Sequence, residues 1–229
     1  MKTIVITKPT FFKQEAEILT RMFEEGLPIL HLRKPGASSG QMRALLLKIP
    51  KVYWNRIVIH SHFNLATRMK LKGIHLTSKV RKKRFNRWKY TRMYRWFHPQ
   101  LHISTSFHNL NSLYNDKTRY DYVFISPVFD SISKGGYQAG FSKYMLKAAI
   151  MNSSQHVIAL GGVDETKVDE VCEVGFYGMA MLGYIWNTDD PVGTYAQVQS
   201  RVLGSMNADT AMSVDKDGIL HIKKISQHV

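Results

Sequence analysis

Short apolar runs alternate with longer amphipathic segments along almost the whole chain. Several of the runs are near-continuous in apolar and β-branched residues, which is typical of strands buried on both faces of a parallel sheet. Eight runs are predicted strands: Ile4–Ile6, Ile29–Leu32, Arg56–His60, Gly73–Leu76, Leu101–Thr105, Asp121–Ser126, His156–Leu160 and Gly178–Leu182.

The segments between these runs have the length and spacing of helices. Apolar residues in Phe12–Glu25 recur at helical intervals. Ser39 is an expected N-cap, and Asp164 is the expected N-cap of a helix over Glu165–Val174 that Gly175 ends. The remaining predicted helices are Ser142–Met151 and Pro191–Leu203.

Strand and helix alternate about eight times, which predicts the α/β class and a single (β/α)8 TIM barrel with a short C-terminal extension. An open doubly wound sheet is the alternative, and both folds bind ligands at the carboxyl ends of their strands. We assign residues 1–203 to the barrel and 204–229 to a C-terminal tail, whose weakly alternating end could add one edge strand.

Composition excludes several classes of protein. The length of 229 residues suits one barrel-sized domain, and 44% hydrophobic residues exclude a disordered chain. The single Cys172 excludes an internal disulfide framework and a Cys-based zinc site. Because the apolar start is too short for a signal peptide and no window resembles a membrane span, we expect a cytoplasmic protein with no membrane partner.

Positive charge is concentrated in one part of the chain. The net charge is +15, and no Asp or Glu occurs between Glu25 and Asp116. Nine basic residues fall between Lys79 and Arg95, a mixture that can bind a nucleic-acid backbone when aromatic rings accompany it. No recognition motif is present, so we predict a solvated basic segment and no specific nucleic-acid partner. Its aromatic residues, which we expect to face the core, are Phe85, Trp88, Tyr90 and Tyr94.

Glycines follow the seventh and eighth predicted strands, where barrels frequently bind phosphate. Gly161 and Gly162 end one strand, and Leu182 and Gly183 follow the other. Backbone N–H groups at such positions can approach an anion, and a helix N-terminus favours negative charge. Two ordinary glycine turns are the alternative, but the paired placement favours a phosphate site.

Three other strand ends carry candidate chemistry. Lys134 lies in a hydroxyl- and glycine-rich loop that could close over a phosphate. Arg33 could chelate phosphate through two N–H groups, and a solvated arginine on the barrel rim is equally consistent. His60 and His62 could share a strand face and ligate a metal. No third ligand is near them in sequence, so we predict a hydrogen-bonded histidine pair and no protein metal site.

Taken in chain order, several segments resemble the thiamine phosphate synthase family, which includes the related thiazole tautomerases. The resemblance runs from about Thr3 to Leu203. The segments that carry it are Leu32-Arg33, Ile59–Ala66, Gly73–Leu76, Ser104, Asp121–Val123, Pro127–Phe129, Lys134-Gly135 and Ala159–Val163.

This resemblance implies an enzyme of thiamine biosynthesis in a (β/α)8 barrel. A synthase of the family couples an aminopyrimidine diphosphate to a thiazole phosphate: diphosphate leaves with magnesium, and the thiazole nitrogen captures a pyrimidine-methyl cation. The resemblance implies that Arg33 binds diphosphate, that Lys134 is the loop lysine and that Ser104 lies near the pyrimidine and diphosphate. The positions implied for the substrate loop and the thiazole-phosphate cradle are Ser131, Ser133, Gly162, Leu182 and Gly183.

The chain departs from the family pattern at the magnesium ligands. An Asn-Asp pair expected after the third strand is His60-Ser61, and a second Asp falls near Val80. We therefore expect magnesium to arrive only with a substrate diphosphate. Fixed cations would then offset the remaining negative charge: Arg33, Lys34, Lys79 and Lys134.

Two further departures keep other activities open. A second lysine expected two residues after Arg33 is Pro35, and the acid–base histidine of a tautomerase is Pro127. A synthase-type transferase acting on phosphorylated small molecules is favoured. The alternatives are an isomerase of thiazole phosphate with His60 as a relocated acid–base group, and a non-catalytic barrel that binds phosphate ligands. The assembly is left open, with a homodimer as one option.

Overall fold

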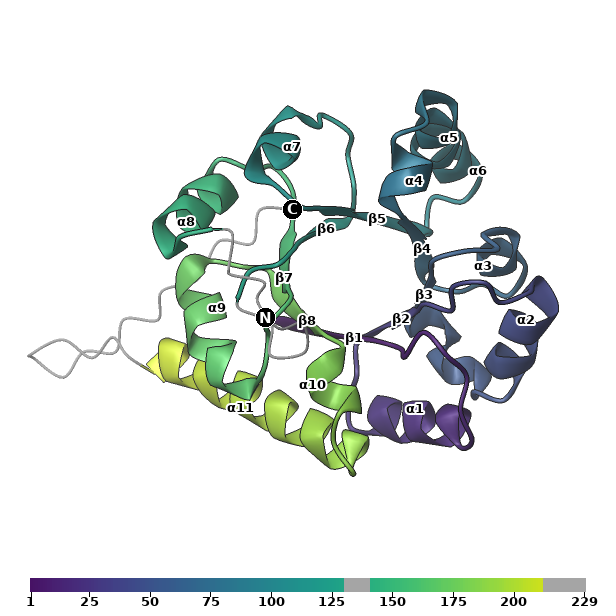
Figure 1. The fold of residues 1–229 in the computed structure, drawn as a ribbon, viewed down its shortest axis with the longest axis horizontal. Coiled ribbons are helices and arrows are strands. Elements are labelled where there is room, and N and C mark those ends of the chain that lie inside the picture. The colour runs from purple at the N-terminus through teal and green to yellow at the C-terminus, as the bar shows by residue number, and fades with distance from the viewer. Residues whose placement is uncertain (130–140, 212–229) are drawn as a thin grey trace, which may run out of the picture.

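In the computed structural model, eight parallel strands close into a barrel in chain order, and helices surround them (Figure 1). The structure describes residues 1–129 and 141–211, with side chains as far as Ser205. The strands are β1 (Lys2–Ile6), β2 (Ile29–Leu32), β3 (Ile57–Ile59), β4 (Gly73–Leu76), β5 (His102–Phe107), β6 (Tyr122–Ile125), β7 (Val157–Leu160) and β8 (Gly178–Met181). The (β/α)8 prediction and all eight predicted strands are confirmed.

The helices follow the strands in alternation. They are α1 (Glu15–Glu24), α2 (Ser39–Leu47), α3 (Asn64–Arg68), α4 (Ser78–Arg81), α5 (Arg84–Trp88), α6 (Arg95–Phe97), α7 (Leu110–Asn115), α8 (Lys143–Met151), α9 (Val168–Val174), α10 (Gly183–Trp186) and α11 (Pro191–Ala211). None of the helices in the described part of the chain combines the length and the apolar character needed to cross a bilayer.

Capping residues set several helix boundaries. The Asp164 carboxylate accepts the Thr166 N–H at the start of a 3-10 turn that leads into α9, as the sequence predicts. The cap of α2 is Ser38 rather than the predicted Ser39, because a capping box joins Ser38 to Gln41. Helix α11 runs on to Ala211, beyond the predicted end at Leu203, and residues 212–229 with their predicted edge strand lie outside the described residues.

Side chains along each strand point alternately into the barrel and toward the helices, which creates two packing regions. One set of side chains fills the barrel interior: Ile4, Ile6, Ile29, Val58, Tyr122, Phe124, Ile158 and Ala180. The other set packs against the surrounding helices in the larger core. Because the side-chain period of a strand is two, the interior set continues from Ile29 to His31 and from Val58 to His60. The carboxyl end of the barrel interior is therefore polar.

The basic segment 79–95 forms α4, α5 and a π-helical turn outside the barrel. Tyr90 packs edge-on against Phe63 with ring centroids 4.9 Å apart, and Tyr94 packs on Tyr90, so these two face the core as predicted. The same prediction is wrong for Phe85 and Trp88, whose exposed fractions are 69% and 55%. Such short helices bury one face only, and these two rings lie on the other.

Candidate active site

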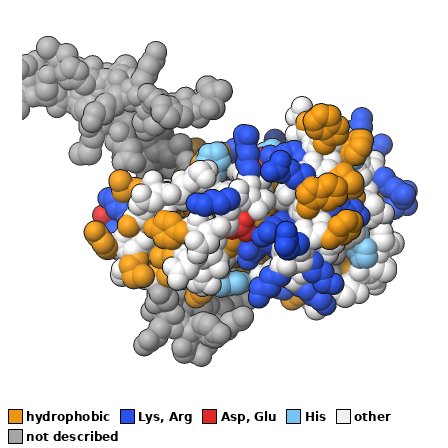
Figure 2. All heavy atoms as spheres, turned by 90° about the horizontal axis from the view of Figure 1, so that it is seen from above, with side chains coloured by type: hydrophobic (Ala, Val, Ile, Leu, Met, Phe, Trp, Pro, Cys, Tyr) orange, Lys and Arg blue, Asp and Glu red, His pale blue; other side chains and the backbone are white. Residues whose placement is uncertain are grey.

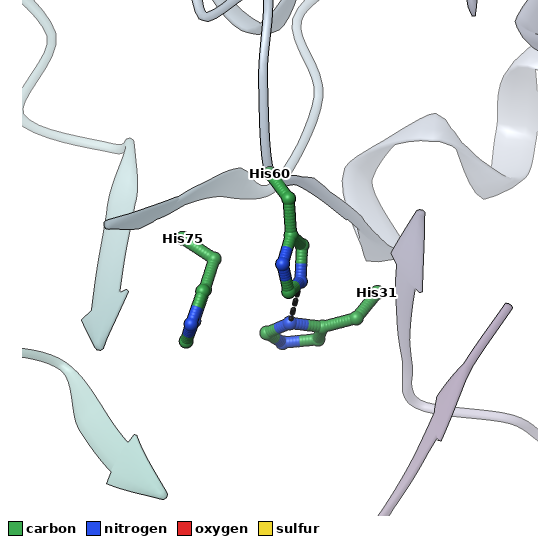
Figure 3. A group of neighbouring side chains, drawn as sticks. All are labelled: His31, His60 and His75. Carbon is green, nitrogen blue, oxygen red and sulfur yellow. Dashed lines mark hydrogen bonds between the residues drawn. The ribbon is translucent and has the colours of Figure 1, made fainter. Parts of the chain in front are cut away.

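Three histidines meet inside the carboxyl end of the barrel (Figure 3). His31 belongs to β2, His60 directly follows β3, and His75 belongs to β4, so three neighbouring strands supply them. His31 and His75 are buried and His60 is half-buried. The ring centroids of His60 and His75 are 4.3 Å apart in a stacked arrangement, and the His31 ring lies edge-on to both.

Hydrogen bonds connect this cluster to hydroxyl groups on β5 and β6. His31 Nδ1 lies 2.9 Å from His60 Nε2, and His31 Nε2 lies 2.6 Å from the Tyr122 hydroxyl. His75 Nδ1 lies 3.0 Å from Ser104 Oγ, and its Nε2 lies 3.1 Å from Ser106 Oγ. Because each imidazole has a polar partner, the cluster can lie in an otherwise apolar interior.

The imidazoles are neutral at physiological pH. Burial lowers the pKa of His75 to about 3, and the positive charge of Arg33 acts in the same direction. Burial also holds the pKa values of His31 and His60 well below their usual range, and neighbouring histidines contribute to both shifts. A neutral imidazole has one N–H donor and one lone pair, so the cluster offers ligand nitrogens without first losing protons.

The predicted pairing of His60 with His62 is wrong. Strand β3 ends at Ile59, and His62 has a left-handed backbone with φ of 52°. Its Nε2 lies 2.7 Å from the Ala37 carbonyl oxygen, away from the cluster. Sequence reasoning missed His31 and His75 as partners of His60. All three stand at or next to the carboxyl ends of predicted strands, at the alternate positions that face the barrel interior.

Of the predicted phosphate-binding cations after β2, one is available and one is not. Arg33 is exposed at the end of β2, and its charge reaches both His60 and His75. Lys34 is buried and forms an ion pair with Glu15, with Nζ 2.5 Å from Oε1. The expectation that Lys34 offsets substrate charge is therefore wrong, because its ammonium group is already neutralised by a buried carboxylate.

The residues of the predicted phosphate cradle lie at the same end of the barrel. Strands β7 and β8 are neighbours, and Leu160 pairs with Ala180, which brings the glycines that follow each strand together. Gly161 and Gly162 have φ of 90° and 67°. A Cβ on Gly161 would lie 2.9 Å from the Pro127 Cα, so a side chain is excluded there. Among the described residues, no acceptor takes the N–H of Gly162 or Gly183.

The remaining predicted site residues divide into two groups. Ser104 is fully buried on β5 beside His75 and contacts its Nδ1. Lys134, Ser131 and Ser133 lie outside the described residues.

At the positions implied for magnesium ligands, the half-buried Ser61 carries a hydroxyl and Val80 carries no polar group. This donor set does not fit a magnesium site, which takes carboxylate oxygens.

A basic groove lies away from these residues, on the side of the molecule that carries α4–α6. Figure 2 shows Lys and Arg side chains around exposed hydrophobic ones on this side. Part of the charge is neutralised, because Arg81 pairs with Asp116 and Arg95 pairs with Asp121. The groove is lined by residues that include Arg84, Arg87, Trp88, Arg92, Arg95 and Arg119.

We predict weak, salt-sensitive binding of nucleic acid to this groove. Contacts of this kind are made to phosphates and release counterions, so the affinity falls steeply between about 50 and 200 mM salt. Fluorescence anisotropy of a labelled single-stranded oligonucleotide, measured over a salt series, checks this expectation. Sub-micromolar affinity that persists above about 200 mM salt would contradict it.

Comparisons with known proteins agree on one family. Residues 3–185 match the family model described as thiamine monophosphate synthase. A solved thiamine phosphate pyrophosphorylase from Bacteroides thetaiotaomicron is 34% identical, covers 88% of this chain and 97% of its own, and has a TM-score of 0.72. The corresponding enzyme from Pyrococcus furiosus, at 18% identity, 90% and 96% coverage and a TM-score of 0.71, supports the fold alone.

Two curated relatives are named thiamine-phosphate synthase. The thiamine-phosphate synthase of Chlorobium phaeobacteroides is 22% identical over 79% of this chain and 86% of its own length. The thiamine-phosphate synthase of Limosilactobacillus reuteri is 29% identical, but that match spans 35% of this chain and 37% of the relative.

Proposed function

The chain belongs to the thiamine monophosphate synthase family, and from this premise we propose that it couples an aminopyrimidine diphosphate to a thiazole phosphate, with release of diphosphate. The observation that carries the proposal is the family match over residues 3–185. The glycine turns after β7 and β8 and the exposed Arg33 at the end of β2 support it. We also assign the protein to the cytoplasm, which a biosynthetic family and a single cysteine support.

The reaction requires stabilisation of a leaving anion rather than proton transfer. The bond between the pyrimidine methylene carbon and the diphosphate oxygen breaks, and its electron pair leaves with the diphosphate. The lone pair of the thiazole nitrogen then forms the new bond to carbon, and no proton is gained or lost. Arg33 stabilises the departing charge, while the N–H groups of Gly162 and Gly183 hold the phosphate of the thiazole.

Magnesium enters this proposal only with the substrate. The positions that would carry its carboxylate ligands hold Ser61 and Val80, and we assign no step to a protein-bound magnesium ion. Fixed cations at the barrel mouth, with Arg33 first among them, take over part of the electrostatic stabilisation.

One observation favours a second activity, an isomerase of thiazole phosphate. His60 is half-buried at the mouth of the barrel, and its imidazole is neutral, so its free lone pair can accept a proton. The His31–His60 hydrogen bond would orient that ring. This candidate is tested in the same experiment as the transferase.

The test is an assay of purified protein with both phosphorylated substrates and magnesium. We expect thiamine phosphate and diphosphate in equal amounts. Arg33→Ala should lower kcat/KM by about 10- to 100-fold, because one or two charge-assisted hydrogen bonds are lost. Arg43→Ala, which removes an exposed arginine from α2, is the matched control and should retain activity.

The products discriminate among the alternatives. Isomerised thiazole phosphate without thiamine phosphate would replace the transferase by the isomerase. Saturable substrate binding without either product would establish the non-catalytic barrel, and an Arg33→Ala variant as active as Arg43→Ala would remove Arg33 from the site.

A further inference from the structure

We propose that His31, His60 and His75 together bind one divalent transition-metal ion of the Zn2+ and Co2+ class. The three side chains converge inside the carboxyl end of the barrel (Figure 3), and one ligand nitrogen from each lies within 4.8 Å of the other two. The proposal goes beyond the transferase assignment, because neither the reaction nor the magnesium that accompanies its substrate requires a histidine site.

One of the distances between the nitrogens is close to that expected around a coordinated ion. Zinc–nitrogen bonds of about 2.0–2.1 Å place two nitrogens of a tetrahedral site about 3.3 Å apart. His31 Nδ1 and His60 Nε2, at 2.9 Å, need to separate by a few tenths of an ångström. The stacked His60 and His75 rings need to turn toward each other about their side-chain bonds, and His60 is only half-buried.

Hydroxyl groups hold the far side of two of the rings. With Nδ1 of His31 on the metal, its Nε2–H donates to the Tyr122 hydroxyl, which lies 2.6 Å away. One nitrogen of His75 can turn to the metal while the other keeps its hydrogen bond to Ser104 or Ser106. Metal-bound histidines almost always have such a partner on the second nitrogen, which fixes the tautomer and the ring orientation.

The chemistry of the donors selects the class of ion. All three ligands are imidazole nitrogens, which suit Zn2+ and neighbouring transition metals, whereas Mg2+ takes oxygen ligands. Positions 61 and 80 carry Ser61 and Val80 instead of carboxylates, and position 60 carries a histidine. These differences are then parts of one change, from a preference for Mg2+ to a preference for a transition metal.

Among the described residues, the site has three protein ligands. The Phe124 ring packs against two of them, with centroids 5.0 Å from that of His31 and 5.4 Å from that of His75, and the third, His60, is half-buried. Three protein ligands with one open position is the arrangement of catalytic rather than structural zinc. The open position would accept water or a diphosphate oxygen; that last assignment rests on the proposed function, whereas metal binding does not.

The experiment is a titration of untagged protein that has been stripped with a chelator. Co2+ is added while visible absorption is recorded, and Zn2+ binding is measured by calorimetry. We expect one ion per chain with a Kd on the order of 1 μM or tighter, which corresponds to at least about 8 kcal/mol. Mg2+ should show no saturable binding in this range. Zn2+ should also raise the melting temperature, because a ligand that binds only the folded state stabilises it.

Matched variants separate the cluster from other histidines. His60→Asn, which keeps a hydrogen-bonding side chain at the half-buried position, should weaken Co2+ and Zn2+ binding by at least about 100-fold. His62→Asn, two residues away and outside the cluster, should leave it unchanged. If His60→Asn does not fold, His31→Gln with a circular dichroism check takes its place.

Absence of stoichiometric binding to the stripped wild type would overturn the proposal, as would binding that survives His60→Asn. No substrate is present in these measurements, so their failure would leave the transferase assay untouched, and failure of that assay would leave the metal site standing.

Discussion

Replacing Glu15 with alanine is expected to destabilise the protein by about 3–5 kcal/mol. The carboxylate and the Lys34 ammonium group have exposed fractions of 2% and 0%. Lys34 Nζ also donates to the carbonyl oxygens of Lys8 and Thr10 at 2.9 and 2.7 Å, which ties the loop after β1 to the end of β2. Without the carboxylate, a buried positive charge is left uncompensated. Denaturant unfolding monitored by circular dichroism measures the loss.

The pH dependence of this loss identifies its cause. Burial lowers the pKa of Lys34 from its ordinary value of 10.5, and Glu15 opposes that shift. In Glu15→Ala the opposing charge is gone, so the folded-state pKa falls further below the unfolded one. The unfolded chain then binds more protons between these two values, and the stability of the variant should rise with pH through that window.

Two controls complete this experiment. Glu15→Leu combined with Lys34→Met removes both charges and should recover much of the stability, because no unpaired charge stays buried. Lys143→Ala breaks an exposed pair with Glu173 and should change the free energy of unfolding little, because solvent screens the two charges. If Glu15→Ala costs no more than Lys143→Ala, the buried pair does not stabilise the fold as argued.

The second large effect is expected for Gly162→Asp, which should abolish binding of phosphate and of the thiazole phosphate. The carboxylate would enter the space beside the N–H groups of Gly162 and Gly183, which donate to no acceptor among the described residues. Two like charges about 4 Å apart repel by roughly 4 kcal/mol near a protein surface, which is about a 1000-fold loss of affinity. Calorimetry with inorganic phosphate and with thiazole phosphate measures this loss.

Gly162→Asn is the matched variant, because it has the same shape and lacks the charge. Gly162 has φ of 67°, close to the left-handed region that Asn and Asp tolerate better than other side chains. Both variants should therefore fold, and Asn should weaken binding much less than Asp. Equal affinities for the wild type and Gly162→Asp would place the phosphate elsewhere.

The buried ion pair and the glycine cradle lie at the same end of the barrel, and they have different tasks. Lys34 and Glu15 fix the backbone next to Arg33, whereas Gly161 and Gly162 belong to the predicted phosphate cradle after β7. Loss of the first is therefore expected in stability, and loss of the second in ligand affinity. The two sets of variants therefore test the stability of the fold and the affinity for phosphate separately.

The sequence by itself determined the barrel and much of its mouth. Runs such as Ile29–Leu32 and Gly178–Leu182 were identifiable because a buried strand is a local run of apolar residues. Each predicted strand appears in the structure. Asp164 was identifiable as a helix cap because capping is also local in sequence: its partner, Thr166, is two residues away. The glycines after β7 and β8 and Arg33 after β2 were located by their place at strand ends.

Only the tertiary structure decided what these residues meet. His31, His60 and His75 are brought together by the closure and register of the barrel, which no local pattern encodes. His62 looked like the partner of His60 because it is near in sequence, but a left-handed backbone turns it away. Lys34 looked like a free cation because Glu15 lies on α1, 19 positions earlier. Hydrophobic burial is a local property of the chain, whereas pairing between side chains depends on contacts that form only when distant segments pack.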